Sequence, residues 1–164
     1  MNRRYLTIVL HFGFAVTMST LAFAIDHPAR PVHTAAMKRV TGIGGIFFKS
    51  NDPDHLREWY RAHLGIEAER EGGAMFKWRR SDDPERESCT VWSLFPNDTN
   101  YFAPSEKPFM INFQVENLDE TLAQLKREGV EVDPHVETYD YGKFGWIMDP
   151  EGNRIELWEP PGAQ

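Results

Sequence analysis

The stretch from Tyr141 to Pro160, YGKFGWIMDPEGNRIELWEP, decides how the rest of the chain is interpreted. Phe144 to Met148 is a short aromatic and aliphatic run, which is typical of a strand. The DPEGN segment that follows predicts a tight turn, because proline fixes φ near the type I value and glycine accepts a positive φ. Arg154 to Glu159 then alternates strictly between polar and apolar residues. This period of two predicts a second strand, with Ile155 and Leu157 on the same face.

Glu156 and Trp158 share the opposite face of that strand. A carboxylate beside an indole has two interpretations at this point. Either Glu156 is a ligand or a general base in a cavity, or the two side chains belong to a solvated strand face with a half-buried ring. The strand alone leaves both open.

Composition limits the classes of protein that the chain represents. The 164 residues, 41% of them hydrophobic, suit one domain or two small modules that share a core. The formal net charge is −7 and no basic patch stands out, so nucleic acid is not an expected partner. The single cysteine, Cys89, excludes an intrachain disulfide and a cysteine-rich zinc site.

The N-terminal residues predict export. Residues 1–24 have the three parts of a signal peptide: a charged start at Arg3-Arg4, a mostly apolar stretch, and a small-x-small cleavage site at Ala22-Phe23-Ala24. Residues 25–40 are then a disordered linker. The expected location is the periplasm or the outside of the cell, with no membrane association after cleavage. An alternative start at Met37 leaves a cytoplasmic protein, and this interpretation stays open.

The sequence of the first half of the folded part predicts a strand, a helix and then three strands. Gly42 to Lys49 is a buried strand. The helix begins with Asp52 as N-cap and Pro53 at the first position, and it ends at Gly65. Its predicted apolar face consists of Leu56, Trp59, Tyr60 and Leu64. Further strands are predicted at residues 67–71, 74–79 and 89–95.

The second half repeats this order. A strand at residues 109–115 precedes a helix at 118–128, which Asn117 caps and Gly129 stops, and strands follow at 132–138, 142–148 and 154–159. The repetition predicts an α+β protein of two βαβββ modules, at residues 41–95 and 109–160. In the loop between them, Tyr101-Phe102 either covers the mouth of a cavity or pins the loop to the core.

Two βαβββ modules that end in DPEGNRIELWEP resemble the vicinal oxygen chelate superfamily, which contains glyoxalases, bleomycin-resistance proteins and extradiol dioxygenases. The resemblance runs from about residue 41 to 160, and it also rests on Trp59-Tyr60, Leu64-Gly65 and the FMINFQV strand. It implies that the sheets curl into a cupped, mixed-sheet barrel around one cavity. It also implies a small organic ligand and a homodimer.

Metal-dependent members of this superfamily place His, Gln or Glu ligands at four strand positions. Transferred to this chain, the positions fall on Gly45, Ser93, Met110 and Glu156. Only Glu156 is a competent ligand, and a slip of one residue on the strand 109–115 offers only a neutral amide, a weak donor to a transition metal. The resemblance therefore implies no metal and no cofactor in this chain.

Alternation along the strands predicts the cavity lining. The expected ligand-binding residues are Phe47, Lys49, Ser93, Phe95, Met110, Asn112, Gln114 and Trp158. A mainly apolar lining with a few polar groups is the usual make-up of a small-molecule site. Glu156 is the catalytic candidate, a general base if apolar walls raise its pKa. The competing interpretation is that Glu156 pairs with Lys49 or an amide and braces the sheet.

The expected function follows from this lining. We expect a glyoxalase-like protein that binds a small, partly apolar organic molecule in a metal-free cavity. It acts either as a binding or resistance module or as a metal-independent lyase or isomerase with Glu156 as base. The alternative is a metal-dependent lyase or dioxygenase of the same superfamily. The expected partners are the small molecule and a second copy of the chain.

Overall fold

The computed structural model of the chain describes residues 39–162. The predicted signal at residues 1–24 lies outside these residues, as does nearly all of the predicted linker at 25–40. The first strand already begins at Val40, the last residue of that linker.

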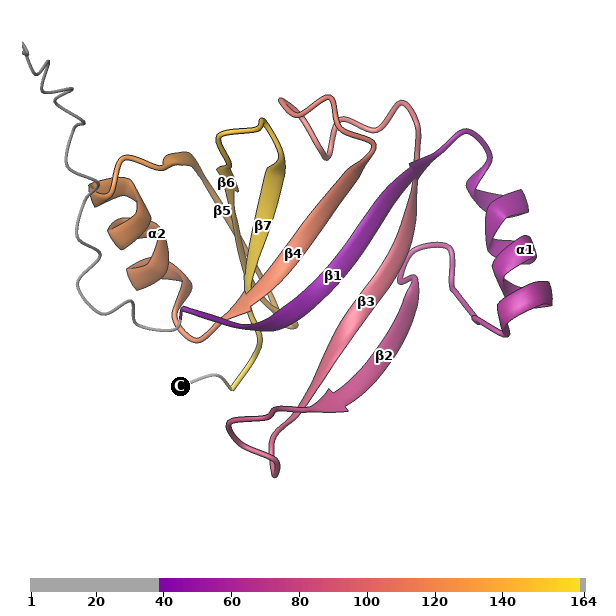
Figure 1. Cartoon of the computed structure of the whole chain (residues 1–164), viewed down its shortest axis with the longest axis horizontal. Coiled ribbons are helices and arrows are strands. Elements are labelled where there is room, and N and C mark those ends of the chain that lie inside the picture. The colour runs from indigo at the N-terminus through magenta and orange to yellow at the C-terminus, as the bar shows by residue number, and fades with distance from the viewer. Residues whose placement is uncertain (1–38, 163–164) are drawn as a thin grey trace, which may run out of the picture. The chain divides into compact units, whose positions relative to one another are not determined.

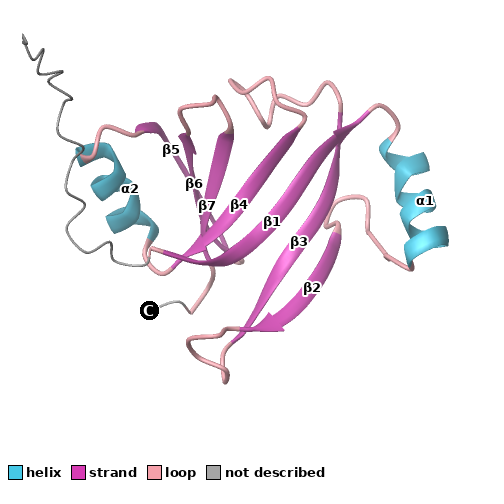
Figure 2. Cartoon of the chain, viewed as in Figure 1, coloured by secondary structure: helices cyan, strands magenta, loops and turns pink. Residues whose placement is uncertain are grey.

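The described residues form seven strands and two helices (Figure 2). Their order along the chain is β1 (Val40–Ser50), α1 (Pro53–Leu64), β2 (Ala74–Arg79), β3 (Glu87–Pro96), β4 (Phe109–Val115), α2 (Leu118–Arg127), β5 (Glu131–Tyr139), β6 (Gly142–Met148) and β7 (Arg154–Glu159).

All seven strands belong to one mixed sheet with the order β2-β3-β1-β4-β7-β6-β5 (Figure 1). β1 runs parallel to β3, β4 runs parallel to β7, and the antiparallel pair β1–β4 joins the two modules. The α+β class and the paired modules are confirmed. The sheet is open, because β2 and β5 are its two edges and do not pair with each other.

One face of the sheet, here called the helix face, carries both helices. α1 covers the first module, where Leu56 and Tyr60 pack against buried Trp92 and Leu94. α2 covers the second module, where Leu118 and Leu122 form a core with Val115 and Leu157. Figure 1 shows the helices beside opposite halves of the sheet. Because apolar burial is the main stabilising term, each module holds its own helix.

The helix ends follow their predicted caps. Asp52 accepts a hydrogen bond from the backbone N–H of His55 at 3.0 Å, and Asn117 accepts one from Glu120 at 2.9 Å. Gly65 ends α1 in the left-handed conformation, with φ of 66°. The predicted apolar face of α1 is partly wrong, because Trp59 is 46% exposed and Leu64 59% exposed. Their positions turn away from the sheet, while Leu56 and Tyr60 face it.

The predicted strand at residues 67–71 is also wrong. This segment makes only an isolated bridge, Glu69 with Gly73. Three of its five residues are glutamates and one is an arginine, and all four of these charged side chains are exposed. Such a segment has too little apolar surface to gain from pairing in a buried sheet. The first module therefore has three strands where four were predicted.

The opposite face of the sheet, here called the loop face, packs against the loop of residues 97–108. Phe102 from this loop is fully buried in a core with Phe47, Met110 and Trp146. The loop is fixed at its end as well, because Lys49 N–H donates to Pro108 O at 2.7 Å. Among the described residues no helix is long and apolar enough to cross a membrane.

The burial of Phe102 predicts that the loop is part of the folding unit. Phe102→Ala should lower the free energy of unfolding by about 3 to 5 kcal/mol, because it leaves a cavity in the loop-face core. Urea denaturation measures this loss. Trp59→Ala is the matched control, because Trp59 is 46% exposed on α1 and should cost far less. An equal loss in both variants would show that the loop is not anchored in this way.

Candidate functional site

Glu156 occupies the middle of the loop face. The strand register places it directly opposite Asn112 on β4 and opposite Trp146 on β6. Asn112 in turn lies opposite Gly45 on β1. Glu156, Asn112 and Trp146 are each only 2% exposed. The carboxylate is therefore held inside the protein by the register of four neighbouring strands.

Three donors satisfy the Glu156 carboxylate. Asn112 Nδ2 donates to Oε1 at 2.6 Å, and Trp146 Nε1 donates to Oε2 at 3.0 Å. The Tyr101 hydroxyl, from the loop, also donates to Oε2. A buried carboxylate is costly unless such bonds replace its water. Both oxygens are used in this way, so the network ties the loop to β4, β6 and β7.

The ring of Tyr101 has aromatic neighbours on two sides. It stacks on Phe95 with ring centroids 5.4 Å apart and an interplanar angle of 3°. It meets Trp146 edge to face at 6.1 Å and 88°. Offset-stacked and edge-to-face contacts are the favoured arrangements of aromatic pairs. Tyr101 is nevertheless 36% exposed, so one edge of the residue remains at the surface.

The protonation of this pair follows from its surroundings. Burial raises the pKa of Glu156, and the hydrogen bonds from Tyr101, Asn112 and Trp146 offset part of that increase. Burial also raises the pKa of Tyr101, and the negative charge of Glu156 raises it further. Tyr101 is therefore the proton donor of the pair and Glu156 the acceptor.

A bulge in β1 makes room for Asn112. The register shifts between Ile43 and Gly45, so that the extra residue Gly44 lies beside Asn112. A Cβ at Gly44 would lie 2.1 Å from Asn112 Oδ1 and 2.8 Å from the Trp158 ring. Asn112 Oδ1 is buried and has no hydrogen-bond partner. The glycine is thus required by the close approach of the amide and the indole.

The residues at the four transferred ligand positions do not fit a metal ion. Gly45 has no side chain, and a Cβ there would lie 2.4 Å from the ring of Phe47. Met110 is fully buried in the apolar core, and the Glu156 oxygens face N–H and O–H donors. Within residues 39–162 no cluster of three or more His, Cys, Asp or Glu side chains is arranged to hold a metal.

A cavity of about 340 Å³ lies on the same side of the sheet, between the strands of the first module and the end of the second. We call it the open cavity. Its lining residues are Thr41, Met75, Lys77, Arg80, Arg86, Glu87, Ser88, Cys89, Gln114, Val115, Tyr141, Trp158, Pro160 and Pro161. The side chains of Trp158, Tyr141 and Met75 form the apolar part of the cavity wall. Gln114 is buried at its base, where it accepts from Ser88 Oγ and donates to Cys89 O at 2.7 Å.

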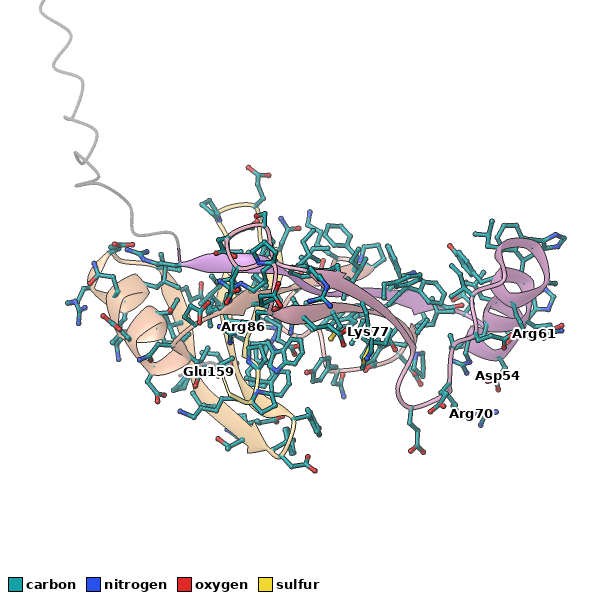
Figure 3. The ribbon with its side chains drawn as sticks, turned by 90° about the horizontal axis from the view of Figure 1, so that it is seen from below. Asp54, Arg61, Arg70, Lys77, Arg86 and Glu159 are labelled. Carbon is teal, nitrogen blue, oxygen red and sulfur yellow. The ribbon has the colours of Figure 1, made fainter. Side chains whose placement is uncertain are left out.

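The cationic side chains of the open cavity have carboxylate partners. Lys77 pairs with Glu87 at 2.8 Å, and Arg86 pairs with Glu116 at 3.2 Å. Arg80 pairs with both Asp82 and Glu116, which raises the pKa of its guanidinium. Figure 3 shows Lys77 and Arg86 among the strands, apart from the charged residues labelled around α1. Each cation of the lining therefore has a carboxylate partner, although of these partners only Glu87 itself lines the cavity.

The structure does not bring the predicted ligand-binding residues together in one site. Gln114 and Trp158 line the open cavity. Most of the others lie around the filled part of the loop face, where Phe47, Met110 and Phe95 pack together and Lys49 lies 5.4 Å from the Phe102 ring centroid. Asn112 and Glu156 form the buried network, and Ser93 is partly buried on β3. Neither Ser93 nor Glu156 is part of the cavity lining.

Several site residues were missed by the sequence analysis. Trp146 was detectable, because the hairpin around the DPEGN turn places it opposite Glu156 and alternation puts it on the same face. Met75 and Lys77 follow from the same rule on β2, where they lie opposite Val91 and Cys89. The bond from Tyr101 to Glu156 had no local signal, since it depends on the path of the loop.

These features and the fold place the chain in a known family. The model of the Glyoxalase/Bleomycin resistance protein/Dioxygenase superfamily matches residues 15–157. The chain therefore belongs to this superfamily, and the resemblance inferred from the DPEGNRIELWEP segment is confirmed. A search among curated proteins finds no matching sequence.

Two solved methylmalonyl-CoA epimerase structures show the same fold. A variant of Streptomyces coelicolor methylmalonyl-CoA epimerase in complex with 2-nitronate-propionyl-CoA is similar with a TM-score of 0.55 and 22% identity, covering 75% of this chain and 99% of that chain. A methylmalonyl-CoA epimerase in complex with methylmalonyl-CoA and NH4+ has a TM-score of 0.55 and 21% identity, and the match covers 76% of this chain and 98% of that chain. A Mn(II)-bound glyoxalase from Novosphingobium aromaticivorans has a TM-score of 0.49 and 21% identity, and the match covers 74% of this chain and 39% of that chain.

The raised pKa of Glu156 predicts how stability depends on pH. The folded state holds the Glu156 proton more tightly than the unfolded chain, whose glutamate pKa is 4.5. The Glu156 contribution to stability should therefore fall as pH rises from about 4.5 through the raised folded pKa, by at most about 1.4 kcal/mol per pH unit. Glu156→Gln should remove this fall, because a neutral amide does not titrate.

Urea denaturation of the wild type and Glu156→Gln at a series of pH values measures the difference between their profiles. Glu58→Gln is the control, because Glu58 is exposed on α1 and its pKa is lowered by Arg61. Parallel profiles for wild type and Glu156→Gln would contradict the assignment of a raised pKa to the buried carboxyl.

Proposed function

We propose that this superfamily member is a binding module that takes one small, partly apolar organic molecule in the open cavity, without a metal ion. The observation that carries the proposal is the cavity itself, in which an aromatic and thioether wall surrounds a buried amide. Its volume of about 340 Å³ lies at the lower end of the range for small-molecule sites. The two epimerases with the same fold were solved with acyl-CoA compounds, which shows that this fold can hold an organic molecule but is no precedent for the neutral ligand proposed here.

Charge pairing around the cavity favours a neutral ligand. A strongly anionic ligand would have to compete with Glu87 for Lys77 and with Glu116 for Arg86. The flat ring of Trp158 stacks on Phe144 with an angle of 4°, and its indole N–H donates to Tyr141 O at 2.9 Å. These contacts fix the ring, so a planar or aromatic face on the ligand would meet a rigid surface.

The geometry of Glu156 favours binding over base catalysis. A general base needs an oxygen within hydrogen-bond reach of a substrate proton. The Glu156 oxygens instead accept bonds from Tyr101, Asn112 and Trp146, and the residue does not line the open cavity. A metal-independent lyase or isomerase with Glu156 as base is therefore the second candidate. A metal-dependent activity ranks third, because the donor set does not fit a metal.

Two further expectations from the sequence remain proposals. We propose a homodimer, supported by the exposure of Met75 (62%) and Phe76 (47%) on the edge strand β2, which pairs with β3 on one side only. We also propose export, which rests on residues 1–24. Native mass spectrometry of protein from its own host determines both the oligomer and the N-terminus. A monomer, or an N-terminus at Met37, would overturn the corresponding proposal.

Ligand binding tests the proposed function directly. A library of neutral aromatic and heteroaromatic compounds is screened against the wild type, and hits are measured by calorimetry. Trp158→Ala should weaken binding of a hit at least about tenfold, because it removes the aromatic wall. Trp59→Ala, which removes an indole on α1 outside the cavity, should leave the affinity unchanged. Absence of any hit, or equal losses in both variants, would contradict a site in the open cavity.

Glu156→Gln separates the binding module from the enzyme. It should keep the affinity of any hit within about twofold, because the carboxylate does not reach the cavity. Assays with chelator present then determine whether a hit is chemically changed. Turnover that survives chelator and is lost in Glu156→Gln would favour the metal-independent enzyme instead.

A further inference from the structure

The two arginines that line the open cavity differ in how many of their donors are in use. A guanidinium group has five N–H donors. Arg80 is buried and donates from all three of its side-chain nitrogens, to Asp82 and Glu116. Arg86 makes one side-chain hydrogen bond within residues 39–162, from Nη1 to Glu116 Oε2 at 3.2 Å. Four N–H groups of Arg86 therefore have no acceptor in this part of the chain.

The position of Arg86 is fixed by both modules. In the turn between β2 and β3, its backbone N–H donates to Asp83 O at 3.0 Å, and its carbonyl oxygen accepts from Arg80 N–H at 3.2 Å. Glu116, which follows β4, holds Nη1 of the side chain. A ligand that binds a side chain already held in place pays less ordering entropy. Arg86 is thus a preorganised donor at the open cavity.

Two side-chain acceptors of the same lining already have donors from the protein. Glu87 Oε1 accepts from Lys77 Nζ at 2.8 Å, and Gln114 Oε1 accepts from Ser88 Oγ. A ligand that offers only donors would have to share these acceptors. A ligand that offers an acceptor instead meets the unused N–H groups of Arg86. The polar part of the lining therefore selects for an acceptor on the ligand.

We propose that the ligand of the open cavity is a planar ring compound with a neutral carbonyl group, which Arg86 binds while the ring contacts Trp158. Both residues line this cavity. The inference rests on the proposed function and specifies its class of ligand. A carbonyl oxygen has two lone pairs, so it can accept from two N–H groups of the planar guanidinium at once. Because it carries no charge, it leaves the bond between Arg86 and Glu116 in place.

Coumarin and naphthalene test this inference as a matched pair of probes. Both are planar molecules of two fused six-membered rings, and only coumarin carries a carbonyl group. Arg86→Met removes the guanidinium group and keeps a long side chain. It should weaken the binding of coumarin at least about tenfold and change the binding of naphthalene less than about twofold, because only coumarin loses a hydrogen bond to a charged donor. Calorimetry measures both dissociation constants.

Arg61→Met is the control for the loss of a guanidinium group elsewhere. Arg61 lies on α1, where it pairs with Glu58 at 2.6 Å, and it does not line the open cavity. Figure 3 shows it apart from Arg86. Arg61→Met should leave the affinity for coumarin unchanged. Equal weakening of coumarin binding in both variants, or no weakening in Arg86→Met, would overturn the inference.

A comparison with 2-naphthoate tests the neutral class in the wild type, without any variant. This probe has the ring system of naphthalene and a carboxylate, which would compete with Glu116 for Arg86. Coumarin should therefore bind the wild type at least about threefold more tightly than 2-naphthoate does. Tighter binding of 2-naphthoate would show that Arg86 selects an anion, and the inference would be wrong.

Trp158→Ala separates a failure of this inference from a failure of the proposed function. It should weaken the binding of coumarin and naphthalene alike, because it removes the aromatic wall that both rings contact. If both probes depend on Trp158 but coumarin does not depend on Arg86, the carbonyl class is wrong and the proposed function stands. If neither probe binds the wild type, the carbonyl class is overturned, and the wider compound library decides the proposed function.

Discussion

The buried carboxylate of Glu156 is the constraint on which the loop face depends. A carboxylate that is 2% exposed is unfavourable unless donors replace the lost water. The chain supplies these donors from β4, from β6 and from the loop between the modules. Each donor fixes the element that carries it. The β-bulge at Gly44 belongs to the same arrangement, because it leaves space for the amide of Asn112.

This network divides the loop face into a filled part and an open part. On one side of Glu156, Phe102 and Tyr101 occupy the surface that the sheet leaves uncovered. On the other side, Gln114 and Trp158 border the open cavity. A position that the family resemblance assigns to a metal ligand thus has a structural role here. Small-molecule binding is then expected beside this network, where the wall is apolar and the charges are paired.

Local features of the fold were predictable from the sequence. The β6–β7 hairpin follows from alternation and from the DPEGN turn, in which Gly152 adopts a φ of 76°. The caps at Asp52 and Asn117 follow from side-chain chemistry. The prediction of a strand at residues 67–71 was wrong, because the charged residues of this segment gain nothing from burial. The prediction that Trp59 belongs to the apolar face of α1 was wrong, because helical spacing gives the position of an apolar face on a helix but not its width.

The candidate site was less predictable, because it depends on contacts between distant parts of the chain. Alternation put Met110, Asn112, Gln114 and Glu156 on one face, as observed. It gave no information on which of them a loop would cover. The bond from Tyr101 to Glu156 depends on the course of residues 97–108, which carry no periodic pattern. The open cavity depends on the pairing of β2 with β3 and on the position of Tyr141.

A double-mutant cycle between Tyr101→Phe and Glu156→Gln tests the central claim most directly. The wild type, the two single variants and the double variant are unfolded in urea at neutral pH, and the coupling energy is calculated from the differences in their free energies of unfolding. A hydrogen bond to a buried charged acceptor predicts coupling of about 1 to 3 kcal/mol. Coupling near zero would contradict the account, because the loop would then not be tied to the sheet through this carboxylate.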